Sequence, residues 1–355
     1  MEDQAASLRK LVERKSEYPE NTEAAEVNQF QQEGHKSRIY RAVVPPPPQS
    51  NPKVQPQAVP FPQQPGQPKV FKTDQAGAEA AAVTADGRKP ARIIAVTSGK
   101  GGVGKTNLTV NLAIAMGMEG KRVIIIDADM GMANVDIILG SMSKYNLLNL
   151  LQPGMELEDV LLRGPYGVNY ISGGSGIEHV ADFSLQERRL LLQKLSKCEE
   201  LADIILIDTG AGIGKNVLDF ILAADEVLLV TTPEPTALTD AYALMKAYNM
   251  LASNKNIRLV VNRVYDEPES MDVVSKLRRT AERFLHMPLP FLGYIYEDRD
   301  FMHSVRQQVP LLIAHPDSLA AKCVRAIANG ILYGRHERVK KGWRDFLEKI
   351  LKFSR

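Results

Sequence analysis

Short apolar runs alternate with helical patterns along most of the chain. Five runs of β-branched and aliphatic residues predict strands buried on both faces, because helices cover both sides of a sheet built from such strands. These runs are Ile93–Val96, Val123–Ile126, Ile204–Ile207, Val227–Val230 and Leu259–Val261. Helical patterns fit between them, for example at Asn107–Met118 and Ala237–Ala252. The alternation predicts an α/β fold with a single doubly wound, mostly parallel sheet and right-handed crossovers.

The region before the first run has a different pattern. Met1–Glu17 is predicted to be a short helix, since Leu8, Leu11 and Val12 recur at helical spacing. Prolines crowd residues 45–68 and an Ala/Gly-rich stretch follows, a composition that favours extended polyproline II over a packed core. We therefore expect an N-terminal helix at 1–17, a flexible linker at 18–91, the α/β domain at 92–333 and a C-terminal segment at 334–355.

Composition then excludes several classes of protein. The chain has 355 residues, and 44 Lys and Arg against 42 Asp and Glu give a formal net charge of +2, which argues against general nucleic-acid binding. Its two cysteines, Cys198 and Cys323, are too few for a disulfide framework, a four-thiolate zinc site or an iron–sulfur cluster. No apolar run approaches the roughly 18 residues of a membrane-spanning helix, and Met1–Glu20 has no apolar core of a secretory signal. We expect a cytoplasmic protein.

The small net charge conceals a basic C-terminus. Gly334–Arg355 holds eight Lys and Arg against three Asp and Glu, a local charge of +5 that leaves −3 for the rest of the chain. Its apolar side chains at helical spacing are Trp343, Phe346, Leu347, Ile350 and Leu351. A basic amphipathic helix of this length is too short to span a bilayer and is typical of the interface of an anionic membrane. The alternative is a C-terminal helix whose apolar face packs on the domain.

The most specific motif follows the first predicted strand. It has the GxxxxGK[ST] spacing of a phosphate-binding loop and consists of Gly99, Lys100, Gly101, Gly102, Val103, Gly104, Lys105 and Thr106, with Asn107 next in the helix. Glycines let backbone N–H groups surround a phosphate at a helix N-terminus. Lys105 then supplies charge to β- and γ-phosphates, and the Thr106 hydroxyl is placed for Mg²⁺. The alternative is a glycine-rich turn that merely closes a strand–helix unit.

Polar side chains end three further strands, at the edge where open α/β sheets place their ligands. Asp127 and Asp129 follow the second run, and Asp208 follows the third. Carboxylates there can hold Mg²⁺ or its waters, although Asp after a strand also commonly caps a helix. Asn262, followed by Arg263, closes the fifth run, and its amide offers a donor and an acceptor that match the adenine edge. A turn-forming Asn is the alternative.

The second lysine of the loop, Lys100, makes it similar to the deviant Walker A loop of the MinD/ParA ATPases. The resemblance implies an ATP-dependent homodimer in which Lys100 reaches the nucleotide of the partner. It implies that Asp129 orients the attacking water, that Asp208 is the Walker B-like residue and that Asn262 and Arg263 border adenine. The implied catalytic residues are Lys100, Lys105 and Asp129, and the implied Mg²⁺ residues are Thr106, Asp127 and Asp208.

The first residues of the chain make the resemblance more specific, to one subgroup of the family. Asp3–Arg9 is similar to the DQAxxLR element of the FlhG-type flagellar regulators within that family, and the loops at 131–136 and 208–213 also resemble theirs. The resemblance implies that this element stimulates an FlhF-type GTPase. The residues that would contact this partner are Asp3, Gln4, Ala5, Leu8 and Arg9. We hypothesise that Gln4 helps to position a catalytic water there, as glutamine does in other GTPases. Flagellar C-ring switch proteins are further partners implied by the resemblance.

Together these features predict a slow, Mg²⁺-dependent ATPase that regulates flagellar number and placement. We expect ATP to assemble the dimer, and two paired tail helices then to bind the inner face of the cell membrane with an avidity that one short helix lacks. Hydrolysis would release them, slowly, because no arginine finger is evident. The alternatives are a ParA-like ATPase that partitions DNA, a MinD-like regulator of the division site and a metallocluster carrier. The last is disfavoured because the chain has no CxxC.

Overall fold

The computed structural model describes residues 90–129, 134–141, 143–173, 184–252, 256–334 and 343–352. The predicted N-terminal helix and nearly all of the linker lie outside the described residues, and so do the positions expected to contact the GTPase, namely Asp3, Gln4, Ala5, Leu8 and Arg9. Within the described part of the chain, no helix is both long enough and apolar enough to cross a lipid bilayer.

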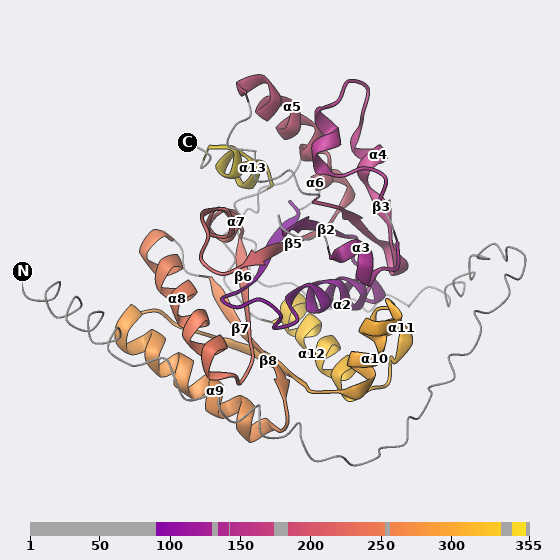
Figure 1. The fold of residues 1–355 in the computed structure, drawn as a ribbon. Coiled ribbons are helices and arrows are strands. Elements are labelled where there is room, and N and C mark those ends of the chain that lie inside the picture. The colour runs from indigo at the N-terminus through magenta and orange to yellow at the C-terminus, as the bar shows by residue number, and fades with distance from the viewer. Residues whose placement is uncertain are drawn as a thin grey trace, which may run out of the picture. The chain divides into compact units, whose positions relative to one another are not determined.

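One eight-stranded sheet organises the described residues, in the order β3-β4-β2-β5-β1-β6-β7-β8 (Figure 1). The strands are β1 (Arg92–Ser98), β2 (Val123–Ala128), β3 (Leu162–Arg163), β4 (Val168–Ile171), β5 (Ile204–Ala211), β6 (Glu226–Thr231), β7 (Ile257–Val264) and β8 (Phe291–Tyr296). Neighbouring strands are parallel except β3 and β4. The predicted α/β fold is therefore confirmed. The five apolar runs form β1, β2, β5, β6 and β7, whereas β8 is an edge strand with mostly half-buried side chains and so lacks a continuous apolar run.

Helices cover both faces of the sheet (Figure 1). The longer ones are α2 (Lys105–Met118), α5 (Leu185–Ser196), α7 (Lys215–Ala223), α8 (Pro235–Leu251), α9 (Glu267–Thr280), α10 (Arg299–Gln307), α12 (Leu319–Tyr333) and α13 (Trp343–Lys352). The short ones are α3 (Val135–Ile138), η2 (Leu147–Leu151), α4 (Leu157–Val160), η3 (Pro165–Gly167), α6 (Cys198–Leu201), η5 (Ala281–Leu285) and α11 (Leu311–Ala314). One core packs α2, α11 and α12 on the sheet, and the other packs α5, α7, α8, α9 and α13. Successive residues of β1 alternate between these cores, which explains why its run is apolar throughout.

The register of the sheet brings distant polar residues to one edge. β5 lies between β1 and β2, and it pairs Asp208 with Val96 on one side and with Asp127 on the other. The loop that follows β1 enters α2 at this same carboxyl edge. The connection after β1 leads to β2 on one side of β1, whereas the connection after β5 leads to β6 on the other side. Such a reversal of strand order is where open α/β sheets form their ligand crevice.

Candidate functional site

The loop from Gly99 to Gly104 joins β1 to α2. Gly104 precedes the first residue of α2 with φ +92°, a left-handed conformation that other residues rarely adopt. A Cβ at Gly99 would lie 2.2 Å from the carbonyl carbon of Asp240, so only glycine lets the loop lie against the backbone of α8. A left-handed turn and a helix backbone thus fix the two ends of this loop.

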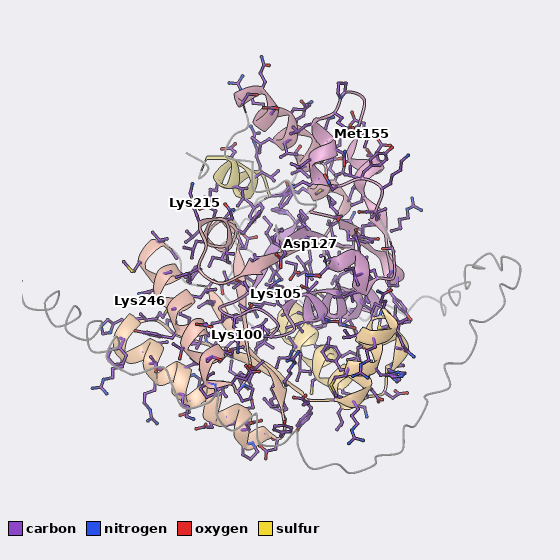
Figure 2. The ribbon with its side chains drawn as sticks, viewed as in Figure 1. Lys100, Lys105, Asp127, Met155, Lys215 and Lys246 are labelled. Atoms are coloured by element: carbon purple, nitrogen blue, oxygen red, sulfur yellow. The ribbon has the colours of Figure 1, made fainter. Side chains whose placement is uncertain are left out.

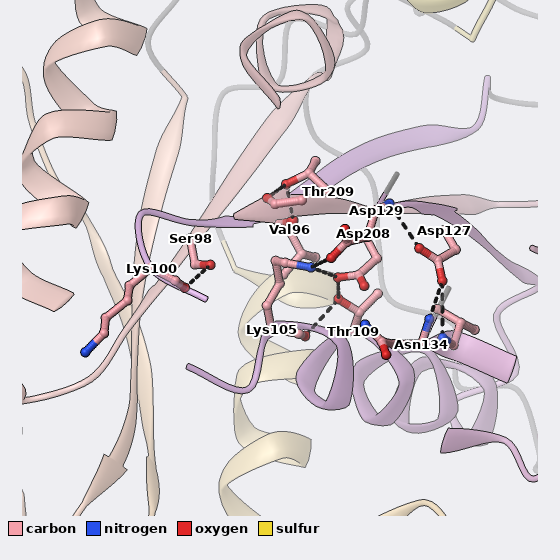
Figure 3. Close-up of polar contacts among 12 residues, drawn as sticks. Val96, Ser98, Lys100, Lys105, Thr109, Asp127, Asp129, Asn134, Asp208 and Thr209 are labelled. Atoms are coloured by element: carbon pink, nitrogen blue, oxygen red, sulfur yellow. Dashed lines mark hydrogen bonds and ion pairs between the residues drawn. The ribbon is translucent and has the colours of Figure 1, made fainter. Parts of the chain in front are cut away.

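Lys105 begins α2 and faces the carboxylates at the strand ends (Figure 3). Its side chain is 7 % exposed, and its Nζ lies 3.0 Å from Oδ1 of Asp208 and 4.0 Å from Oδ2 of Asp129. The Thr109 hydroxyl lies 3.0 Å from the same Asp208 oxygen and 3.1 Å from the carbonyl oxygen of Lys105. Because a lone buried charge is costly, the lysine and the carboxylate stabilise each other in this cluster.

The Asp127 carboxylate accepts hydrogen bonds from three backbone N–H groups (Figure 3). Its Oδ1 accepts the N–H of Asp129 at 3.0 Å, and its Oδ2 accepts the N–H groups of Asn134 at 3.0 Å and Val135 at 3.2 Å. Burial and the negative charge of Asp208 raise the pKa of Asp127 to about 7, and the three backbone hydrogen bonds oppose that rise. The carboxylate therefore pairs the backbone N–H groups of Asn134 and Val135 at the start of α3, although the N-cap residue of that helix is Asn134.

Lys100 points away from this cluster (Figure 2, Figure 3). Its Nζ lies 2.6 Å from Oε2 of Glu234 and 2.8 Å from the hydroxyl of Thr236, both at the start of α8. Its side chain is 36 % exposed, and its hydrogen bond and then its charge hold the pKa of Glu234 below the usual range. The two lysines of the loop are therefore separated, with Lys105 buried in the site and Lys100 outside it.

Three side chains that contact this site or Lys100 are absent from the sequence motifs: Thr109, Glu234 and Thr236. Thr109 follows Lys105 by four residues and so shares its face of the helix, a spacing that sequence reasoning can detect. Glu234 and Thr236 reach Lys100 because β6 lies beside β1, and no local pattern contains that information.

Asn262 lies on β7 and contacts the phosphate-binding loop. Its Nδ2 donates to the carbonyl oxygen of Val103 at 2.7 Å, and its Oδ1 accepts the N–H of Arg263 at 3.0 Å. The structure thus joins the predicted base-contacting residue to the phosphate-binding loop. Arg263 is exposed beside it and has a left-handed φ of 58°.

The predicted tail helix is α13, and in this structure it packs on the domain (Figure 1). The side chains of Trp343, Phe346 and Leu347 are buried, and Ile350 is partly buried against the same core. Trp343 donates its indole N–H to the carbonyl oxygen of Leu195 in α5. Leu351 also belongs to α13, but its side chain lies outside the description.

The groove that receives α13 adjoins the strands of the candidate site. With the helix in place, a partly open apolar cavity of about 40 Å³ remains beneath it. The residues of the domain that line the cavity are Ile126, Leu147, Leu191, Leu195, Ile207 and Phe220. Ile126 and Ile207 directly precede Asp127 and Asp208, so the cavity beneath the tail helix is lined by the same strands that carry the carboxylates.

The donor set at the strand ends fits a magnesium-bound nucleotide. Oδ2 of Asp208 is buried and has no hydrogen-bond partner among the described residues, so it remains available to an ordered water or a cation shell. Thr106 carries a hydroxyl on the first turn of α2, and Lys105 beside it supplies a cation for phosphate. The fold and this site define a P-loop nucleotide-binding protein.

Comparisons with known proteins agree with that class. Residues 94–311 match the CobQ/CobB/MinD/ParA nucleotide binding domain. The antiactivator FleN of Pseudomonas aeruginosa is 40 % identical over 242 residues, which are 68 % of this chain and 86 % of that protein. The flagellum site-determining protein YlxH of Helicobacter pylori is 34 % identical over 275 residues, which are 76 % of this chain and 92 % of that protein.

A solved structure shares the fold as well. The septum site-determining protein MinD of Pyrococcus horikoshii, complexed with Mg-ADP, is 27 % identical and has a TM-score of 0.55. The similarity covers 68 % of this chain and 96 % of that one. The chain therefore belongs to the MinD/ParA family of nucleotide-binding proteins.

Thr109→Val tests whether the hydroxyl orients Asp208 for the magnesium shell. A hydrogen bond to a charged group contributes about 1.5–3 kcal/mol, so we expect the affinity for ADP measured by calorimetry with Mg²⁺ to fall about tenfold or more. With EDTA in place of Mg²⁺, the Thr109→Val protein and wild type should bind ADP with the same affinity. Thr280→Val is the matched control, because Thr280 donates to the carbonyl of Lys276 four residues earlier on an exposed face. Equal losses with and without Mg²⁺ would contradict the prediction.

Proposed function

We propose that the protein is an ATP-hydrolysing switch that forms a homodimer when it binds ATP. The position of Lys100 carries this proposal, because the lysine extends out of its own phosphate site and is held at the exposed start of α8 by Glu234 and Thr236. An ammonium there is accessible to the phosphates of a nucleotide in a second copy. The γ-phosphate of ATP carries the charge that can draw it from Glu234.

Within each subunit, Lys105 and the N–H groups of the loop bind the β- and γ-phosphates in this proposal. Thr106 and Asp208 would hold Mg²⁺, with Asp127 supporting its shell, and the ion supplies neutralisation of the phosphate charge when bound. Asp129, whose side chain is 27 % exposed near Lys105, orients the water that attacks the γ-phosphorus. The bond from that phosphorus to the oxygen of ADP breaks, giving ADP and phosphate. Turnover is slow until a partner stimulates it.

The tail helix links this cycle to a membrane in our proposal. The apolar face of α13 is buried, so it has to leave its groove before the same side chains can enter lipid. One wall of the groove is α7, which follows the loop after Asp208 on β5, and Phe220 of α7 lies 6.4 Å from the ring of Phe346. Movement of that loop on nucleotide binding is a direct way to release the helix. The protein is then cytoplasmic, and its ATP-bound form is peripheral at the inner face of the membrane.

The cellular role that we propose follows from the relatives. Both FleN, an antiactivator, and YlxH, a flagellum site-determining protein, align over two thirds or more of this chain. We infer that this protein regulates the number and placement of flagella. It would stimulate an FlhF-type GTPase through Asp3–Arg9 and also contact switch proteins of the flagellar C-ring.

Lys100→Ala is the central test of the dimer. With a non-hydrolysable ATP analogue, we expect wild type to elute as a dimer in size-exclusion chromatography with light scattering. Lys100→Ala should remain a monomer under the same conditions. Its affinity for the nucleotide should change less than about threefold. Lys246→Ala, an exposed lysine on α8, is the control and should dimerise. A Lys100→Ala protein that dimerises like wild type would refute the contact between subunits.

Phe220→Ala tests the docking of the tail helix. Truncating a buried Phe costs about 3–5 kcal/mol, part of which is lost from the contact with α13, so the fraction that sediments with anionic liposomes without ATP should rise severalfold. Quenching of Trp343, the sole tryptophan, by brominated lipid should rise in parallel. Phe284→Ala, at a side chain 60 % exposed, is the control. Unchanged sedimentation of folded Phe220→Ala would count against release of the helix.

Gln4→Ala tests the N-terminal element in the full chain. If Gln4 positions the attacking water in the FlhF-type GTPase, the stimulated rate of GTP hydrolysis should fall about tenfold or more, while the protein's own ATPase rate stays the same. Gln29→Ala, in the linker, is the control. Full stimulation by Gln4→Ala would remove this glutamine from the mechanism.

A further inference from the structure

Asn262 lies at the carboxyl end of β7 with a side chain that is 1 % exposed. Its Nδ2 donates to the carbonyl oxygen of Val103 at 2.7 Å, in the loop between β1 and α2. Its Oδ1 accepts the N–H of Arg263 at 3.0 Å, which fixes the amide with Nδ2 toward Val103. One buried amide therefore joins the strand next to the predicted base site to the phosphate-binding loop.

This contact sets the direction of one peptide unit of the loop. The C=O and N–H of a trans peptide point in opposite directions, so a Val103 carbonyl directed at Asn262 turns the N–H of Gly104 away from it. A Cβ on Gly104 would lie 2.5 Å from Nδ2 of Asn262. Gly104 and Asn262 therefore pack closely. The hydrogen bond from Asn262 on β7 fixes the direction of the Gly104 N–H, which directly precedes α2.

The backbone of β7 bends to make this contact. Arg263 has a left-handed φ of 58°, a conformation that is unfavourable for a residue other than glycine, and the ladder to β8 shifts register between Asn262 and Val264. The bend is what presents the N–H of Arg263 to the amide oxygen. Backbone strain is thus concentrated at the residue that orients Asn262.

We propose that Asn262 is a positioning residue for the phosphate-binding loop and couples base binding to phosphate binding. A primary amide has two N–H donors and two acceptor lone pairs, of which Val103 and Arg263 use one each. One N–H and one lone pair remain for the edge of an adenine. The base and the loop therefore share one side chain. The inference rests on the ATP binding proposed above and adds a second role to the base-contacting residue.

Magnesium tripolyphosphate separates the two roles, because it carries phosphates without a base. In Asn262→Ala, we expect the affinities for Mg·ATP and for Mg·tripolyphosphate both to fall about tenfold by calorimetry. Asn256→Ala is the matched control, since Asn256 donates from its own Nδ2 to the carbonyl of Asp225 at 3.0 Å just before β7. It should change neither affinity.

Asn262→Asp is the second variant, in case the alanine variant does not fold. It keeps an acceptor for the N–H of Arg263 but has no donor for Val103, so the loss with tripolyphosphate should recur, with thermal unfolding as the check on folding. Loss of affinity for ATP with unchanged tripolyphosphate binding would overturn the inference and leave Asn262 as a base contact alone. A wild-type protein that bound neither ligand would overturn the proposed function as well.

Discussion

The arrangement of the site depends on the buried ion pair of Lys105 and Asp208. Each charge alone would cost several kcal/mol on removal from water, and their mutual attraction offsets part of that cost. The pair forms because β5 lies next to β1, which places Asp208 at 3.0 Å from the first lysine of α2. A phosphate that enters the site competes with Asp208 for Lys105. In the proposed mechanism, nucleotide binding redistributes this pair and frees the carboxylate of Asp208 for the magnesium shell.

The helix α8 supports the loop from its other side. Its backbone at Asp240 lies where a side chain on residue 99 would be, and its first turn holds Lys100 through Glu234 and Thr236. The loop is thus a rigid element with two cations in different environments. Lys105 is compensated by the buried carboxylate of Asp208, whereas Lys100 pairs with an exposed carboxylate, and exposed pairs contribute little to stability. In the proposed dimer, the weaker pair of Lys100 and Glu234 is the one that the partner's nucleotide replaces.

The sequence alone predicts the features that depend on local pattern. Continuous apolar runs indicate the central strands, and the glycine spacing indicates the loop and Lys105. Strand order is not contained in such patterns, so neither the pairing of Asp127 with Asp208 nor the reach of Glu234 to Lys100 follows from them. The pattern of α13 likewise shows an apolar face without showing what covers it, because protein and lipid are both apolar surroundings.

The helix α12 ends at the edge of the sheet opposite the nucleotide site. Tyr333 donates its hydroxyl to Glu119 at the end of α2 at 3.1 Å, and Arg92, which begins β1, donates to the last turn of α12. Gly334 and Trp343 are nine residues apart, so the chain between them extends at most about 30 Å. A lipid-anchored α13 would therefore hold the molecule at the edge of the sheet where the parallel strands begin. In the proposed membrane-bound form, the nucleotide edge would then face away from the lipid, within reach of a second copy and of other proteins.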